Sequence, residues 1–168
     1  MTAQFRDTLL YNGRQYSLAT EPLRPYLEAM DIEFQGTSTA NYRGYLATWE
    51  INNDKLYLLK AIIPGYCSDI AEPTNLFPGQ EKTFADWYTG CIRIPHGERL
   101  EYVHQGYGSL YEKDLFLRFL NGKLLGSSEI DNRPEFEERV ARQKRYEKER
   151  ESRKPKNRLL KFLGLKEL

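Results

Sequence analysis

The chain has 168 residues, of which 40% are hydrophobic and 29% charged, and its formal net charge is +1. These values are typical of a water-soluble globular protein, and no run approaches the roughly 20 apolar residues of a membrane-spanning helix. The N-terminus carries no basic segment followed by an apolar stretch, and two cysteines cannot build a disulfide framework, so we expect a cytoplasmic protein.

Charge is distributed unevenly along the chain. Residues 1–132 hold 12 Lys and Arg against 17 Asp and Glu, whereas residues 133–168 hold 13 against 7. We therefore expect an acidic, β-rich globular domain over residues 1–132, a charged helix over residues 133–152, and a basic C-terminal segment with apolar residues over 153–168.

Residues 5–19 are predicted to form a first β-hairpin. Its turn is Asn12-Gly13, because a type I′ turn needs two positive φ angles and these residue types adopt them readily. Residues 22–30 contain two prolines and are expected to form either one helical turn starting near Pro25 or an irregular crossing segment. A short strand is expected to follow over residues 32–36.

The densest apolar and aromatic run, residues 42–64, is predicted to form a central hairpin with a three-residue loop over 52–54. Alternate residues of a strand share a face. A three-residue loop places Trp49 opposite Tyr57 and puts both apolar sets on one face, whereas a two-residue loop pairs Trp49 with Leu58 and splits them. The two sets are Tyr45, Ala47, Trp49 and Ile51 on the first strand, and Tyr57, Leu59, Ala61 and Ile63 on the second.

A loop and two further strands are expected after the central hairpin. Residues 65–82 are rich in proline and glycine and are predicted to form the loop. The strand over residues 83–94 is predicted to turn at 95–97 and to return over 99–104.

A last hairpin is predicted at Asn121-Gly122, a second type I′ signal that joins strands over residues 114–120 and 123–130. The run of hairpins predicts a mainly β fold, an antiparallel meander that is barrel-like or sandwich-like, with a charged α-helix at the C-terminus. The residues expected in the core are Trp49, Leu59, Ile92, Leu100 and Leu117.

The charged helix is predicted to begin at Asn132, where a capping side chain is followed by proline in the first turn and glutamate three positions on. It is expected to end near Ser152 and to lie in solvent, because nearly all residues after Val140 are charged. The C-terminal segment joins a cationic stretch to large apolar side chains, so we expect it to mediate self-association or partner binding. The residues expected to dock are Leu159, Leu160, Phe162 and Leu163.

Several stretches together resemble an uncharacterised family of bacterial proteins of unknown function. They are RGYLATWEI at 43–51, DKLYL at 54–58, ADWYTGCIRIP at 85–95, LEYVHQGYGSLYEKDL at 100–115 and EIDN at 129–132. The resemblance covers about residues 5–132, and it implies a bacterial cytoplasmic protein without indicating a mechanism.

Cys91 and His104 are the candidate catalytic residues, for a hydrolase of unrecognised type. A cysteine–histidine pair needs the two side chains within hydrogen-bond reach. Cys91 lies in the middle of a predicted strand, whereas an activated thiol usually needs a helix N-terminus or a cationic neighbour. Alternation also groups His104 with Tyr102 rather than with the face that carries Cys91. The structural interpretation is a buried thiol and a hydrogen-bonded histidine. The spacing of cysteines and histidines fits no metal site, and we expect neither metal nor cofactor.

Two binding functions remain. A nucleic-acid-binding module would use the basic C-terminal segment and an aromatic stacking platform, although the acidic domain repels phosphate. The platform would consist of Tyr42, Tyr45, Trp49, Trp87 and Tyr88.

A protein-interaction module without catalysis of its own is the leading hypothesis, because tyrosine, tryptophan and arginine are enriched at interface anchors. A toxin-neutralising or antagonist role is one version of this function. The residues expected to bind are Tyr42, Arg43, Tyr45, Trp87, Tyr88 and Tyr107.

Overall fold

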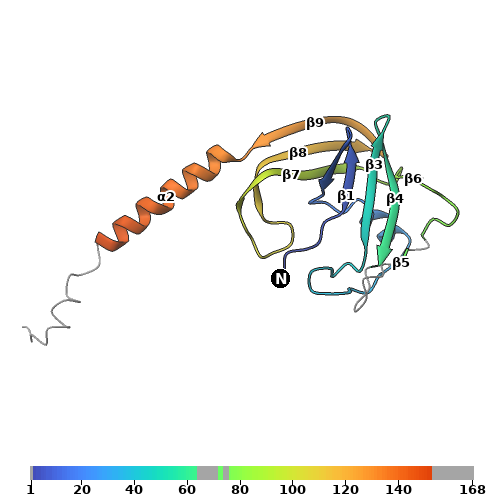
Figure 1. Ribbon diagram of the computed structural model, residues 1–168, viewed down its shortest axis with the longest axis horizontal. Coiled ribbons are helices and arrows are strands. Elements are labelled where there is room, and N and C mark those ends of the chain that lie inside the picture. Colours follow the sequence, from blue (N-terminus) through green and yellow to red (C-terminus); the bar gives the residue numbers. More distant parts are fainter. Residues whose placement is uncertain (1, 64–71, 74–75, 153–168) are drawn as a thin grey trace, which may run out of the picture. The chain divides into compact units, whose positions relative to one another are not determined.

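The computed structural model describes residues 2–63, 72–73 and 76–152. The chain forms two compact units, Met1–Asn132 and Arg133–Leu168. Figure 1 shows strands throughout the first unit and the helix α2 in the second.

The first unit is mainly β and is built on one mixed sheet that includes every described strand (Figure 1). Along the sheet the order is β2-β1-β3-β4-β9-β8-β7, and the short strands β5 and β6 both pair with β4. The mainly β fold predicted from the sequence is therefore confirmed. The strands are β1 (Thr8–Tyr11), β2 (Arg14–Ser17), β3 (Leu46–Asn52), β4 (Lys55–Ile63), β5 (Glu72–Pro73), β6 (Thr83–Phe84), β7 (Gly90–Glu101), β8 (Leu110–Leu120) and β9 (Lys123–Asp131).

The sheet is barrel-like because its two end strands, β2 and β7, lie close together. The Ala19 amide, just after β2, donates to the carbonyl oxygen of Arg93 at 2.9 Å, and the Arg93 amide donates to the Thr20 hydroxyl at 2.9 Å. The predicted antiparallel meander is wrong at one pairing, since β1 runs parallel to β3 with Leu9 beside Trp49. A parallel pair needs a long connection, and β2 with the helix that follows it supplies one.

Both predicted Asn-Gly turns are confirmed. The φ angles are 50° and 70° at Asn12 and Gly13, and 48° and 72° at Asn121 and Gly122. At Gly122 a Cβ would lie 2.5 Å from the carbonyl oxygen of Ala85, so only glycine fits there. These turns set the registers of the β1–β2 and β8–β9 hairpins.

The central hairpin of β3 and β4 is present, but the predicted register is wrong. Its loop has two residues, Asn53 and Asp54, with φ angles of 50° and 57°. Trp49 therefore pairs with Leu58 rather than with Tyr57. Positive φ at both loop positions is the type I′ geometry, whose twist matches that of the strands.

The predicted apolar set of β4 is wrong at Tyr57 and Leu59 and correct at Ala61, because a β-bulge at Leu59 interrupts the alternation. Thr48 pairs with Lys60 and Trp49 with Leu58, so Leu59 has no partner in the ladder. One extra residue reverses the alternation beyond the bulge. The buried residues of β4 are consequently Leu56, Leu58 and Ala61.

Two other local predictions are wrong. Residues 32–36 form no strand. Residues 95–97 do not turn the chain but lie inside β7, which pairs with β8 on both sides of them. The ladder is irregular between His96 and Arg99, and φ at Gly97 is 83°, so the Pro-His-Gly sequence bends the strand without ending it.

The hydrophobic core fills the inside of the barrel. Trp49, Ile92 and Leu117 are fully buried, as predicted, whereas Leu59 and Leu100 are only half-buried. Leu59 is the bulged residue, and Leu100 lies in the second irregularity of β7, between Arg99 and Glu101. Irregular pairing is thus where the alternation rule fails to identify core positions.

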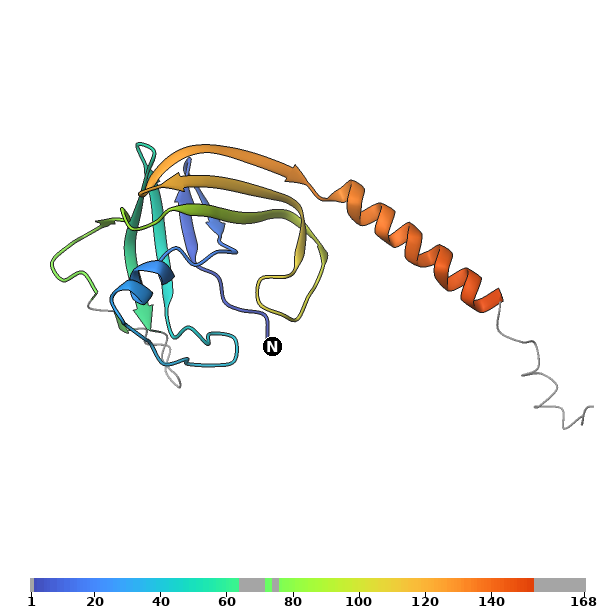
Figure 2. The ribbon, with the colours of Figure 1, turned by 180° about the vertical axis from the view of Figure 1, so that it is seen from behind.

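The predicted helical turn is α1 (Arg24–Ala29), which is in front in Figure 2. Pro25 lies in its first turn and Leu27 is its buried residue. After the helix, φ at Asp31 is 55° and the Ile32 amide donates to the Leu27 carbonyl oxygen at 2.9 Å. This left-handed residue ends the helix and turns the chain away.

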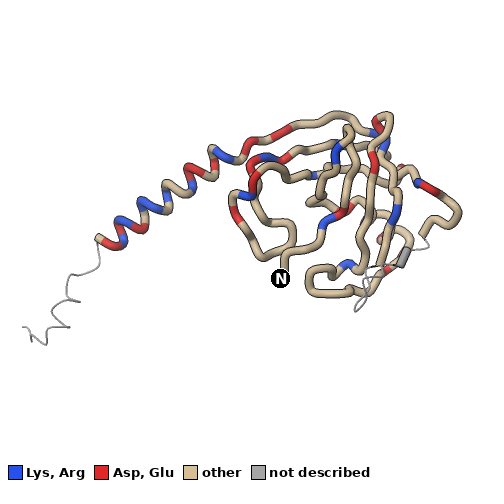
Figure 3. Tube along the Cα trace, viewed as in Figure 1, with Lys and Arg blue, Asp and Glu red and all other residues tan. Residues whose placement is uncertain are grey.

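Helix α2 (Arg133–Ser152) is the described part of the second unit and covers the residues of the predicted charged helix. None of its residues is buried, and Figure 3 shows acidic and basic residues alternating along it. Glu138 and Arg142 form an ion pair at 3.8 Å, one helical turn apart. No helix in the described ranges is long and apolar enough to cross a membrane.

The predicted docking segment, residues 153–168, lies outside the described residues, as do residues 65–71 and 74–75 of the predicted loop over residues 65–82. The docking role of the C-terminal segment stays a prediction. Its four expected docking residues are Leu159, Leu160, Phe162 and Leu163.

Candidate functional site

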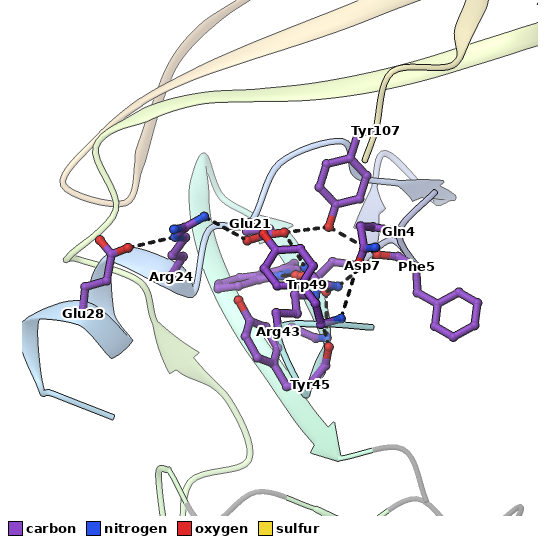
Figure 4. A network of polar contacts seen from close by, with 12 residues as sticks. Gln4, Phe5, Asp7, Glu21, Arg24, Glu28, Arg43, Tyr45, Trp49 and Tyr107 are labelled. Atoms are coloured by element: carbon purple, nitrogen blue, oxygen red, sulfur yellow. Dashed lines mark hydrogen bonds and ion pairs between the residues drawn. The ribbon is translucent and has the colours of Figure 1, made fainter. Parts of the chain in front are cut away.

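A buried ion pair between Asp7 and Arg43 forms the base of the candidate site (Figure 4). Asp7 directly precedes β1 and is 1% exposed, and the Arg43 side chain is 6% exposed. One carboxylate oxygen of Asp7 accepts hydrogen bonds from Arg43 Nη2 at 2.6 Å and from the Ala47 amide at 2.9 Å. The other accepts one from Trp49 Nε1 at 3.1 Å. The start of β3 is thereby fixed to the start of β1.

The turn before β3 sets the direction of the Arg43 side chain. Gly44 has a φ of 78°, and a Cβ at this position would clash with the carbonyl oxygen of Gln35, so the turn requires glycine. Arg43 Nε donates to the Tyr45 carbonyl oxygen at 3.1 Å, and the guanidinium lies 4.8 Å from the centre of the Tyr45 ring. The Arg43 guanidinium is thus held by a hydrogen bond from Nε and by its position over the Tyr45 ring.

A second layer of contacts surrounds Glu21, which Figure 4 shows between Arg24 and Tyr107. The Tyr107 hydroxyl donates to Glu21 Oε1 at 2.8 Å, and the Phe5 carbonyl oxygen is a second acceptor 3.3 Å from the same hydroxyl. Arg43 Nη1 lies 3.8 Å from Glu21 Oε1, and Arg24 Nη1 lies 3.8 Å from Oε2. Glu21 therefore connects the buried ion pair with charges nearer the surface.

Burial shifts the pKa values of the ionisable side chains in this cluster. Removal from water raises the pKa of Asp7, and the Arg43 charge and the hydrogen bonds to the carboxylate oppose that rise. Burial also raises the pKa of Tyr45 and of Tyr107. Tyr107 therefore keeps the proton that it donates to Glu21.

Two buried polar atoms of the cluster have no hydrogen-bond partner among the described residues. They are Nη1 of Arg43 and the hydroxyl oxygen of Tyr45. A buried polar group without a partner costs about 1–3 kcal/mol, so such groups are rare in folded proteins. Their presence here indicates a place where an entering group can complete the hydrogen bonding.

A recess of about 420 Å³ opens at this cluster, within the size range of ligand pockets. Four carboxylates and two guanidinium groups line it, which gives its wall a formal charge of −2. The lining residues are Glu21, Arg24, Leu27, Glu28, Asp31, Ile32, Glu33, Phe34, Tyr42, Arg43 and Tyr45. We call it the acidic recess.

A second, less polar recess of about 660 Å³ adjoins Tyr107. Tyr42 lines both recesses and is 56% exposed. An exposed aromatic side chain thus stands between two hollows in the surface. The second recess is lined by Thr2, Gln4, Thr39, Tyr42, Gln105, Gly106 and Tyr107.

Four of the six residues predicted to bind come together at this surface: Tyr42, Arg43, Tyr45 and Tyr107. The other two do not join them. The Trp87 ring stacks on Phe77, with ring centres 5.6 Å apart, and donates from Nε1 to the Pro22 carbonyl oxygen at 3.1 Å. Tyr88 is 4% exposed, and its ring centre lies 5.9 Å from that of Phe119.

The aromatic stacking platform predicted for nucleic acid is wrong. Tyr45, Trp49 and Tyr88 are 2%, 0% and 4% exposed, so three of its five rings face the interior. Stacking on bases needs exposed ring faces. The three buried rings, Tyr45, Trp49 and Tyr88, belong to the hydrophobic core and not to an exposed face.

The structure does not bring Cys91 and His104 together. Cys91 is the second residue of β7 and is exposed rather than buried, whereas His104 follows the far end of that strand. His104 Nδ1 lies 2.8 Å from the Tyr102 hydroxyl, which agrees with the predicted hydrogen-bonded role. In the ranges that the structure describes, no group of three His, Cys, Asp or Glu residues is placed to hold a metal ion.

Sequence reasoning missed Asp7 and Glu21, the two acidic residues of the cluster. Asp7 contacts Arg43 across 36 positions, and Glu21 contacts Tyr107 across 86. The one local signal is an aspartate directly before an apolar strand, a common arrangement that does not reveal which donors it meets.

No protein-family model, no curated protein and no solved structure matches the chain. The resemblance to a bacterial family stays a prediction that rests on the motifs at residues 43–51, 54–58, 85–95, 100–115 and 129–132.

Proposed function

We propose that the chain is a protein-interaction module whose partner binds at the surface around Tyr42. The observation that supports this most is the convergence of Tyr42, Arg43, Tyr45 and Tyr107 above a buried, hydrogen-bonded ion pair. Tyrosine and arginine are enriched at the energetic centres of protein interfaces.

The support beneath Tyr42 favours binding because it is already ordered. The Tyr42 amide donates to Gln4 Oε1 at 3.2 Å, and Gln4 Nε2 donates to the Thr39 carbonyl oxygen at 2.8 Å. A partner then loses little free energy in fixing the backbone at its contact point. The recesses on either side of the ring offer space for partner side chains.

The charge of the first unit supports a basic partner surface. Residues 1–132 carry 12 basic and 17 acidic residues, and complementary charge speeds association and excludes acidic competitors. In a bacterial cytoplasm, neutralising or antagonising a toxin is one form that such binding takes. The function requires no catalysis by this chain.

The test is site-specific photocrosslinking of the full chain in its host. Benzoylphenylalanine replaces Tyr42 in one variant and Leu125 in the other. Leu125 on β9 is 63% exposed and serves as a matched control because Tyr42 is 56% exposed. We expect a discrete protein adduct from position 42 that mass spectrometry identifies, and none at position 125. Equal or absent adducts at the two positions would contradict the proposal.

A further inference from the structure

The acidic recess carries negative charge that its own arginines do not neutralise. Arg24 Nε already binds Glu28 Oε1 at 2.8 Å, and Arg43 Nη2 already binds Asp7 Oδ1 at 2.6 Å. Both guanidinium groups on the wall are therefore committed to carboxylates.

Asp31 and Glu33 are the carboxylates left over. Both are exposed, both line the recess, and neither has a partner within the part of the chain that the structure describes. The left-handed conformation at Asp31, with φ of 55°, directs the chain out of α1 along the recess wall. Two unpaired carboxylates in one hollow attract a cation.

The recess also has an aromatic and apolar wall. Tyr42, Phe34 and Leu27 contribute to it, and the exposed Tyr42 ring can accept a planar cation on its face. The chain itself contains this arrangement, since the Arg43 guanidinium lies 4.8 Å from the centre of the Tyr45 ring.

Unpartnered donors supply the second, independent sign of a ligand. Arg43 and Tyr45 are each more than nine-tenths buried and each line the recess. Among the described residues the tyrosine hydroxyl has no hydrogen-bond partner, and Arg43 Nη1 has none beyond its 3.8 Å ion-pair contact with Glu21. An acceptor such as a carbonyl oxygen would provide the missing hydrogen-bond partner for these two donors.

We propose that the acidic recess binds an arginine residue of a peptide segment. The guanidinium binds Asp31 and Glu33 and stacks on Tyr42, and the main-chain carbonyl oxygen of the same residue is directed toward Arg43 and Tyr45. This inference rests on the proposed protein-binding function and adds the chemical group that the partner presents.

Arginine fits better than the other charged groups. Its planar guanidinium binds carboxylates through two donors and stacks on aromatic rings, whereas the lysine ammonium is a compact point charge. Phosphate and carboxylate ligands are repelled by the wall charge of −2.

The experiment is an NMR titration of the full chain with acetylated, amidated pentapeptides Gly-Gly-X-Gly-Gly. X is arginine, lysine or citrulline, which has the shape of arginine without its charge. We expect the arginine peptide to shift the amide signals of residues 31–45 and to bind at least tenfold more tightly than the citrulline peptide. Equal affinities for arginine and citrulline would overturn the inference.

Matched variants test the two carboxylates. Asp31→Asn/Glu33→Gln should weaken arginine-peptide binding at least tenfold, whereas Glu81→Gln/Glu98→Gln should change it less than twofold. The control pair is exposed, lies outside the acidic recess and removes the same charge. All four substituted residues are exposed, so the unfolding midpoints should agree. Equal weakening in both variants would mean general charge attraction and would also overturn the inference.

A further arm identifies the source of the arginine. A peptide of residues 152–158 of this chain, SRKPKNR, is titrated in the same way. Binding that Asp31→Asn/Glu33→Gln weakens at least tenfold supports the inference with the chain's own basic segment as the source. If this peptide does not bind while the arginine pentapeptide still does, the inference is supported and the arginine comes from a partner protein.

The two proposals fail separately. If position 42 crosslinks a partner and the arginine peptide does not bind, the protein-interaction function stands and the arginine recess is overturned. If the arginine peptide binds and position 42 captures nothing beyond the Leu125 control, the recess stands and the proposed function loses its support.

Discussion

The first unit has two interiors of different kinds. Inside the barrel, Trp49, Ile92 and Leu117 are buried in an apolar core, which stabilises the fold in proportion to the area removed from water. Beneath Tyr42, Asp7 and Arg43 are buried as ions, and burying an ion pair gains little or no stability over apolar packing. The difference teaches that the apolar core accounts for the stability of the fold, whereas the polar interior needs another explanation, for which we propose binding.

Trp49 belongs to both interiors, so its removal should have the largest effect. Trp49→Ala removes a fully buried ring and the indole donor to Asp7, and should lower the free energy of unfolding by about 3–5 kcal/mol. Urea unfolding measures the loss. Trp49→Phe keeps most of the packing and should recover more than half of it. Unchanged stability of Trp49→Ala would contradict the placement of β3 at the centre of the core.

The ion pair should show strong coupling between its partners. Arg43→Met leaves the Asp7 carboxylate buried without its cation and should cost about 3 kcal/mol of unfolding free energy. Asp7→Asn/Arg43→Met removes both charges and should cost less than Arg43→Met alone. A double-mutant cycle by urea unfolding checks this. Additive losses would show that the two side chains do not act as a pair.

The apolar interior was largely predictable because its signals are local. Alternation along β3 and β7 marked Trp49 and Ile92, and the two Asn-Gly pairs marked their turns. The prediction failed at Leu59 and Gly97, where a bulge or bend inserts residues into the ladder. Such irregularities depend on the partner strand, which a single strand's sequence does not specify.

Gly44 should matter more than its place in a turn suggests. Gly44→Ala puts a Cβ against the Gln35 carbonyl oxygen at a φ of 78°, and should cost about 2 kcal/mol while displacing Arg43. Gly13→Ala is the matched control, since φ is 70° but no atom lies within 4 Å of the added Cβ. It should cost about 1 kcal/mol. Equal losses in thermal unfolding would remove the steric argument for Gly44.

The candidate site was predictable only in part. The exposed and half-exposed aromatic residues Tyr42 and Tyr107 were identified from composition, but the acidic residues that support them were not. Asp7 and Glu21 acquire their roles from contacts across 36 and 86 positions, and no periodic pattern encodes such pairings. Residue type gave candidates, and the barrel topology decided which of them meet.

Alkaline pH should destabilise the fold through its buried tyrosines. Burial raises the pKa of Tyr88 to about 12, against about 10 in the unfolded chain. Between these values the unfolded state loses a proton that the folded state keeps, so the free energy of unfolding falls as pH rises, by about 1 kcal/mol at pH 11. Burial raises the pKa of Tyr45 and Tyr107 in the same direction. Urea unfolding at pH 8 and 11 measures the fall, which Tyr88→Phe should reduce. An undiminished fall in that variant would contradict the assignment.

The most direct test of the account is the effect of Tyr45→Phe on stability and binding together. The Tyr45 hydroxyl is buried without a partner among the described residues, so its removal should raise the free energy of unfolding by about 1 kcal/mol. If that hydroxyl serves a bound peptide, the same variant should weaken arginine-peptide binding several-fold in the NMR titration. A more stable protein that binds less well is the predicted result. A less stable protein with unchanged binding would show that the polar interior beneath Tyr42 is only structural.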